Sequence, residues 1–95
     1  MAKQISQLTQ LIWDYYRENW ADLERLRCLG RCDVFRRWGV LHIRCYHPRD
    51  VEAVVRSRSL IAVPLAKLRI VQKVKILQAR AEVMSFKIGA DMQLA

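Results

Sequence analysis

Residues 40–47, with the sequence VLHIRCYH, give the clearest indication of the fold class of this chain. Positions 41, 43 and 45 hold apolar side chains, whereas positions 42, 44 and 46 hold polar or aromatic ones. An alternation with a period of two residues is typical of a β-strand that has one buried face. We therefore expect Leu41 and Ile43 to be buried and His42 and Arg44 to be exposed.

Helical patterns flank this strand on both sides. Before it, apolar residues recur at steps of three and four over residues 4–29, and Gly30 stands where a helix commonly ends. After it, Pro48 suits the first position of a second helix. Pro64 should break that second helix, because proline lacks an N–H group, and a short helical turn should follow through Leu68.

Two further segments complete the predicted fold. Residues 32–36 are expected to pair with the central strand through an Arg-Arg-Trp-Gly turn. Residues 70–77 are rich in β-branched side chains, which favours a strand to Leu77 and then a helix to Ile88 that stops at Gly89. The apolar spacing over 70–88 also fits one long helix. The sequence thus predicts an α+β fold, with a long N-terminal amphipathic helix packed on a small sheet and one or two further helices.

Composition indicates one small domain spanning residues 1–95. Hydrophobic residues make up 53% of the chain and charged residues 27%, a balance typical of a folded domain. No apolar run approaches the roughly 20 residues that cross a membrane. The first residues also lack the pattern of a signal peptide. Three cysteines without a disulfide-framework spacing favour a reducing, cytoplasmic location.

The positive charge is concentrated in the middle of the chain. The net charge is +8 and the sequence pI is about 10.0. Residues 1–24 carry two basic against four acidic side chains, whereas residues 25–80 carry fourteen against three. Twelve of the seventeen basic residues are arginine, whose planar guanidinium suits contacts with phosphates and carboxylates. This distribution favours a polyanionic partner, although a merely solvated basic surface would give the same count.

Aromatic side chains lie among these charges, as they do on surfaces that stack nucleic-acid bases. The sequence therefore predicts a nucleic-acid-binding module that uses an arginine-rich strand and helix. The candidate residues are Arg36, Arg37, Trp38, Arg44, Tyr46, Arg49, Arg56, Arg58, Lys73 and Lys75.

A second hypothesis is a protein-interaction adaptor. Its basic face would meet an acidic protein partner, and its first helix would present Trp13, Tyr16 and Trp20, because tryptophan and tyrosine are common interface anchors. Core packing is the favoured interpretation of the same three rings, because they lie on the apolar stripe of the helix. Association of two copies through this helix would make the protein a homo-oligomer.

Neither metal binding nor catalysis is predicted. Cys28, Cys32, Cys45 and His47 match the ligand types of zinc, but they lack the paired short spacings of structural zinc sites, and buried cysteine is a common core residue. Zinc is therefore an open alternative. The three glycines are too scattered for a phosphate-binding loop, and no nucleophile motif accompanies the two histidines. We expect a non-enzymatic protein without a cofactor.

The order of elements also carries a family resemblance. An N-terminal helix is followed by a strand at 38–48, a helix at 49–60 and a strand at 70–77. This order resembles the small KH-like domain at the N-terminus of the replication initiator DnaA, and it also resembles the related DciA-type helicase loaders. The resemblance covers roughly residues 35–77.

The strand motif of those families is a glycine, a leucine and an isoleucine or valine at alternate positions, which Gly39, Leu41 and Ile43 match here. The resemblance implies a docking module of bacterial replication that contacts the replicative helicase and sometimes DNA. The GXXG loop of KH domains is absent from the sequence, so RNA binding through such a loop is not implied.

Overall fold

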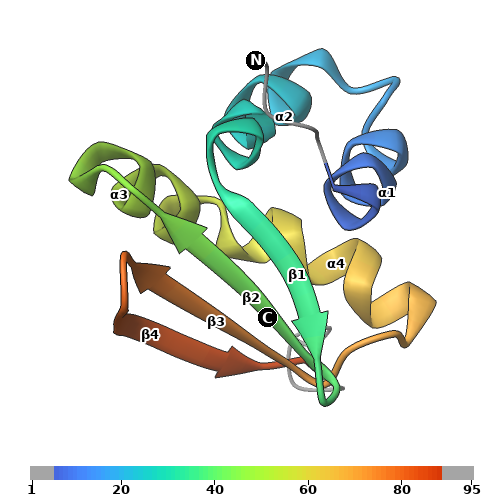
Figure 1. Cartoon of the computed structure of the whole chain (residues 1–95). Coiled ribbons are helices and arrows are strands. Elements are labelled where there is room, and N and C mark those ends of the chain that lie inside the picture. Colours follow the sequence, from blue (N-terminus) through green and yellow to red (C-terminus); the bar gives the residue numbers. More distant parts are fainter. Residues whose placement is uncertain (1–5, 89–95) are drawn as a thin grey trace.

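The computed structural model describes residues 6–88 and confirms the α+β class. Figure 1 shows the helices and the strands. In chain order they are α1 (Gln7–Tyr15), α2 (Trp20–Arg25), the 3-10 helix η1 (Leu26–Arg31), β1 (Asp33–Arg37), β2 (Val40–Cys45), α3 (Pro48–Arg56), α4 (Arg58–Leu68), β3 (Lys73–Gln78) and β4 (Ala81–Lys87).

The strands form one mixed sheet in the order β1-β2-β3-β4. β1 and β4 run antiparallel to their neighbours, whereas β2 and β3 are parallel and are joined by α3 and α4. In Figure 1 these two helices lie behind the strands. Side chains from α1, η1, α3 and α4 pack with the inner side chains of the sheet in one core. The sheet is therefore covered by helices on one face.

The alternation of the central strand is confirmed on its inner side. Leu41 and Ile43 are completely buried in that core. The expected exposure of His42 and Arg44 is wrong, because both side chains are half-buried. The reason is their neighbour Phe35, whose ring stacks on the His42 ring and lies under the Arg44 guanidinium.

The N-terminal helix is shorter than predicted. The expected helix over residues 4–29 is divided into α1, α2 and η1, and its first two residues lie outside the described part of the chain. A continuous helix of that length would measure about 39 Å, about the greatest extent of the molecule, 38 Å. Asn19 starts α2 anew, because its side chain accepts a hydrogen bond from the backbone N–H of Asp22. The break folds the segment back over the core.

The predictions for the second half need two corrections. The helix that begins at Pro48 ends at Ser57 and not at the expected Pro64. Pro64 lies inside the next helix, α4. Residues 81–87 form strand β4 and no helix, so both the predicted terminal helix and the single long helix are wrong. Met84 and Phe86 of β4 pair with Ile76 and Val74 of β3 and extend the core. Gly89, expected to end the helix, lies outside the described residues.

None of the helices between residues 6 and 88 is both long and apolar enough to cross a membrane.

Candidate nucleic-acid interface

The turn between β1 and β2 presents the most exposed aromatic ring among the described large hydrophobic residues. Arg37 pairs with Val40, so only Trp38 and Gly39 form the turn. Both have positive φ, 55° for Trp38 and 72° for Gly39, as two-residue hairpin turns of the I′ type require. Asparagine and glycine adopt this conformation readily, whereas a bulky aromatic residue is disfavoured there. The Trp38 side chain is nevertheless 93% exposed.

The face of the sheet that points away from the helices carries a stacked cluster. Phe35, His42 and Lys75 lie in one cross-strand row on β1, β2 and β3. The centroids of the Phe35 and His42 rings are 4.9 Å apart and their planes differ by 10°. The Arg44 guanidinium carbon lies 5.5 Å from the Phe35 centroid, within the range of a cation–π contact. We call this surface the open sheet face.

Basic side chains surround the cluster on the same face. The register places Arg37 on β1 and Lys73 on β3 on either side of Val40, and it places Lys87 of β4 opposite Lys73. Lys75 forms a long ion pair of 3.8 Å with Glu82. The open sheet face therefore combines flat rings with cations drawn from all four strands.

The electrostatic field of these cations acts on His42. Burial lowers the pKa of His42 below its ordinary value, and the charges of Lys75, Arg37 and Arg44 lower it further. The imidazole is therefore favoured in its neutral form, in which one ring nitrogen can accept a hydrogen bond.

Tyr46 follows β2 at the edge of this face. Its hydroxyl donates a hydrogen bond to the Asp33 carboxylate, and this bond is the main cause that raises the pKa of Tyr46. Half of the side chain is exposed. The hydroxyl is thus engaged within the protein, while the exposed part of the side chain is accessible to a partner.

Four of the ten predicted residues lie away from the open sheet face. Arg36 pairs with Leu41, so it belongs to the opposite side of the sheet, and it donates to the carbonyl of Ile70 at 3.3 Å. Arg49 is exposed in the first turn of α3. Arg56 and Arg58 lie on either side of the junction between α3 and α4. The structure brings Arg37, Trp38, Arg44, Tyr46, Lys73 and Lys75 to one side of the sheet or its rim.

Two members of this surface were not predicted from the sequence. Phe35 could have been found by pairing residues 32–36 with the central strand, which places it opposite His42. Lys87 was missed because β4 was expected to be helical. Its signal is the alternation of apolar Met84 and Phe86 with polar Ser85 and Lys87.

The aromatic residues proposed as a protein interface have different surroundings. Tyr16 is buried, and its hydroxyl donates to the Leu60 carbonyl at 2.8 Å. The indole N–H of Trp13, a half-buried residue, donates to the Leu26 carbonyl at 2.9 Å. Trp20 is 70% exposed and lines a shallow depression of about 380 Å³ together with Trp13 and Leu23. Only Trp20 of the three is largely open to a partner.

The cysteines gather in the core. Cys28, Cys32 and Cys45 are buried, and the Sγ atoms of Cys32 and Cys45 are 3.3 Å apart. Burial raises the pKa of Cys28 to about 11. His47 is exposed. Within residues 6–88, no group of three or more histidine, cysteine, aspartate or glutamate side chains is arranged to hold a metal ion.

A search of known protein families, curated proteins and solved structures gives no match to this chain. The resemblance to the DnaA and DciA domains therefore stays a prediction.

Proposed function

We propose that this domain binds single-stranded nucleic acid on the open sheet face and that it has no catalytic role. The observation that carries the proposal is Trp38. Its ring is 93% exposed at a backbone conformation that disfavours it, next to Arg37. Backbone strain that persists at an exposed position is typical of functional sites. A flat ring beside cations suits the stacking of unpaired bases.

The remaining contacts follow from the arrangement of the sheet. Arg37, Arg44, Lys73 and Lys75 would neutralise the phosphates of a strand that crosses the sheet. Trp38 at one rim and Tyr46 at another would stack bases. His42 would take up a proton more readily beside a bound phosphate, because a negative charge offsets the cations that depress its pKa.

The test is the affinity for labelled single-stranded oligothymidylate and oligouridylate, measured by fluorescence anisotropy over a range of salt concentrations. Trp38→Ala is expected to weaken binding by about 1 to 3 kcal/mol. Lys75→Gln is expected to flatten the dependence of log K on log salt by about 0.7, because one cation that neutralises a phosphate is removed.

Matched controls lie on the helical side of the molecule. Trp20→Ala removes another exposed tryptophan, and Lys67→Gln removes an exposed lysine of α4. Neither control is expected to change the affinity. Equal binding by wild type and Trp38→Ala would refute the proposal, as would an equal loss of affinity in the two controls.

A protein-docking function is the second candidate, and Trp20 favours it. Its exposed indole borders the depression lined by Trp13 and Leu23, where an apolar side chain of a partner could be anchored. Self-association through this site would appear in sedimentation equilibrium and would disappear in Trp20→Ala. The resemblance to replication docking modules supports either candidate as part of a replication-linked adaptor.

A further inference from the structure

Two cysteines face each other at the base of the β1–β2 hairpin. Asp33 pairs with Arg44 in the antiparallel ladder, so the next position places Cys32, just before β1, opposite Cys45, the last residue of β2. Opposite residues of antiparallel strands have Cα atoms about 4.5 to 5.5 Å apart. This spacing lies within the range that a disulfide bond bridges, about 4.4 to 6.8 Å. The backbone therefore has the geometry that a disulfide requires.

The two side chains point toward each other inside the core. Sγ of Cys32 donates a hydrogen bond to Sγ of Cys45 at 3.3 Å. Cys32 is 4% exposed and Cys45 is completely buried. A disulfide bond is about 2.0 Å long, so the sulfurs have to approach by about 1.3 Å. Rotation of the two side chains, rather than movement of the strands, brings them together.

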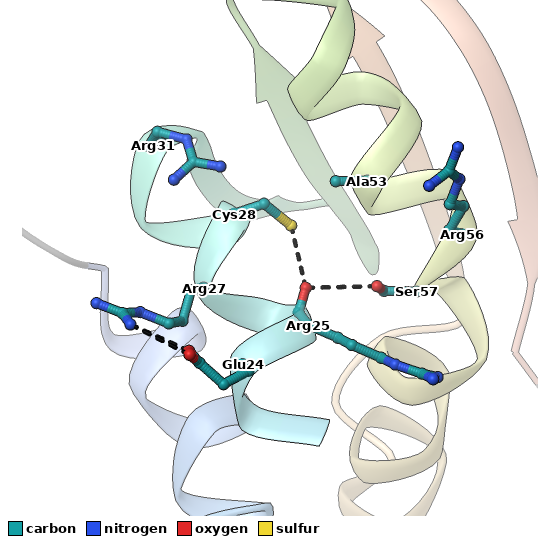
Figure 2. Close-up of a pocket in the computed structure, with 8 residues that line it drawn as sticks. All are labelled: Glu24, Arg25, Arg27, Cys28, Arg31, Ala53, Arg56 and Ser57. Carbon is teal, nitrogen blue, oxygen red and sulfur yellow. Dashed lines mark hydrogen bonds and ion pairs between the residues drawn. The ribbon is translucent and has the colours of Figure 1, made fainter. Parts of the chain in front are cut away.

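The third cysteine of the chain is directed elsewhere. Sγ of Cys28 donates to the Arg25 carbonyl at 3.5 Å, and Figure 2 shows this bond beside the one from Oγ of Ser57 to the same carbonyl. Cys28 lines an open groove of about 720 Å³, and neither Cys32 nor Cys45 is among the residues that line it. Burial raises the pKa of Cys28 to about 11, so this side chain stays a thiol at neutral pH and does not compete as a nucleophile.

We propose that Cys32 and Cys45 are a redox-controlled site, in which a small disulfide such as oxidised glutathione converts the two thiols into a reversible disulfide bond. The thiolate of one cysteine attacks a sulfur of oxidised glutathione, and one glutathione thiolate leaves. The other cysteine thiolate attacks the protein sulfur of this mixed disulfide and releases the second glutathione. The two cysteines lose two protons and two electrons, and the two glutathione molecules gain them.

The bond ties β1 to β2 at the base of the hairpin that carries Trp38. Cys32 adjoins an edge strand, and strand ends open locally more readily than the centre of a sheet, so the oxidant reaches the pair at this end. A cross-link stabilises a protein mainly by restricting its unfolded chain. The oxidised protein is therefore expected to unfold at a higher temperature than the reduced one. This inference does not rest on the proposed binding of nucleic acid.

The test incubates the folded protein with oxidised and reduced glutathione in varied ratios, at a pH of about 8, close to the ordinary pKa of a thiol. The reaction is stopped with excess N-ethylmaleimide in denaturant, and the protein is analysed by mass spectrometry. With excess oxidised glutathione, one cysteine should be alkylated instead of three. Peptide mapping should place the label on Cys28 and link Cys32 to Cys45, and dithiothreitol should restore three labelled cysteines.

Three alkylated cysteines in excess oxidised glutathione would overturn the proposal. A peptide map in which Cys28 takes part in the disulfide, or in which glutathione stays attached to the protein, would overturn it too. So would a cross-link between two copies of the chain, because the bond would then not close the hairpin.

Thermal unfolding with and without oxidation supplies the second measurement. Oxidation should raise the midpoint temperature of the wild type by about 5 °C or more. Cys28→Ala is the matched control and should show the same rise, whereas Cys32→Ser and Cys45→Ser should show none. Where a serine variant does not fold, the peptide map and the temperature shift of the wild type decide. An equal rise in the serine variants, or no rise in the wild type, would overturn the proposal.

Discussion

The carbonyl of Leu60 shows how a single missing N–H group shapes this molecule. In α4 that carbonyl would accept its helical hydrogen bond from residue 64, but residue 64 is proline. The hydroxyl of Tyr16, just after α1, donates to the same carbonyl at 2.8 Å. Pro64 is tolerated inside the helix because a side chain from the N-terminal segment supplies the donor that the helix lacks.

Tyr16→Phe is therefore expected to lower the free energy of unfolding by about 1 to 2 kcal/mol, because a partly buried carbonyl loses its donor. The measurement is urea unfolding followed by circular dichroism. Tyr15→Phe is the matched control. Tyr15 is exposed and its ring meets that of Tyr16 edge to face, so removing its hydroxyl should change little.

A double mutant distinguishes this hydrogen bond from general packing. In a Pro64→Ala background, residue 64 has an N–H group that can donate to Leu60. Tyr16→Phe should then cost less than it does in the wild type. Equal costs in both backgrounds would contradict the link between the two residues.

The Trp38 side chain is expected to destabilise its turn, because a bulky side chain disfavours the positive φ of this position. Nothing in the turn requires an aromatic ring. Trp38→Asn is expected to raise the free energy of unfolding by about 1 kcal/mol, since asparagine adopts positive φ more readily. Thermal and urea unfolding would measure the gain. Trp38→Ala should leave stability nearly unchanged, because alanine has the same difficulty at φ 55°. No gain for asparagine would mean that the Trp38 backbone is not strained.

At the scale of the elements, the pairing of strands creates the open sheet face. The His42 ring stacks on Phe35 of β1. Its pKa is lowered by burial and by the charges of Lys75 of β3, Arg37 of β1 and Arg44 of β2. These side chains come from three strands, and the pairing register places them together. Burial and the charges on three paired strands together lower the pKa of His42.

This arrangement predicts a pH dependence of stability. The pKa of His42 in the folded protein lies below its ordinary value of 6.5. As the pH falls below 6.5, the unfolded chain takes up the proton before the folded protein does, so the free energy of unfolding should decrease. His42→Gln should remove this part of the decrease. Urea unfolding on both sides of pH 6.5 measures it, and an unchanged slope in the variant would exclude His42 as its source.

At the scale of the whole molecule, β2 is the centre of the core. Ile43 is completely buried and pairs with Val34 on one side and Ile76 on the other. Ile43→Ala should lower the free energy of unfolding by about 2 to 4 kcal/mol, because it removes buried methyl groups and leaves a cavity. Leu11→Ala, at an exposed position of α1, is the control and should cost much less. Similar decreases in both would contradict the central place of β2.

At the same scale, folding separates basic residues that are neighbours in the sequence. The basic residues are spread along the sequence from 25 to 80, but folding divides them between the open sheet face and the helical side. Arg36 and Arg37 are neighbours in β1 and point to opposite sides, because successive side chains of a strand alternate. Charge counting along the chain predicted a basic surface. It could not predict that folding would divide these basic residues between two sides of the molecule.

Local sequence was enough to predict the central strand, the start of α3 at Pro48 and the α+β class, because these follow from short-range periodicity and from the fixed φ of proline. The division of the N-terminal helix and the strand character of β4 became visible only in the folded molecule. In both segments the apolar spacing suited a helix. In the folded molecule the N-terminal segment turns after α1, and Tyr16 is buried in the core. Met84 and Phe86 pack against the core from a strand. Burial of apolar area against distant partners outweighs the small differences in local propensity, and distant partners are not visible in a sequence window.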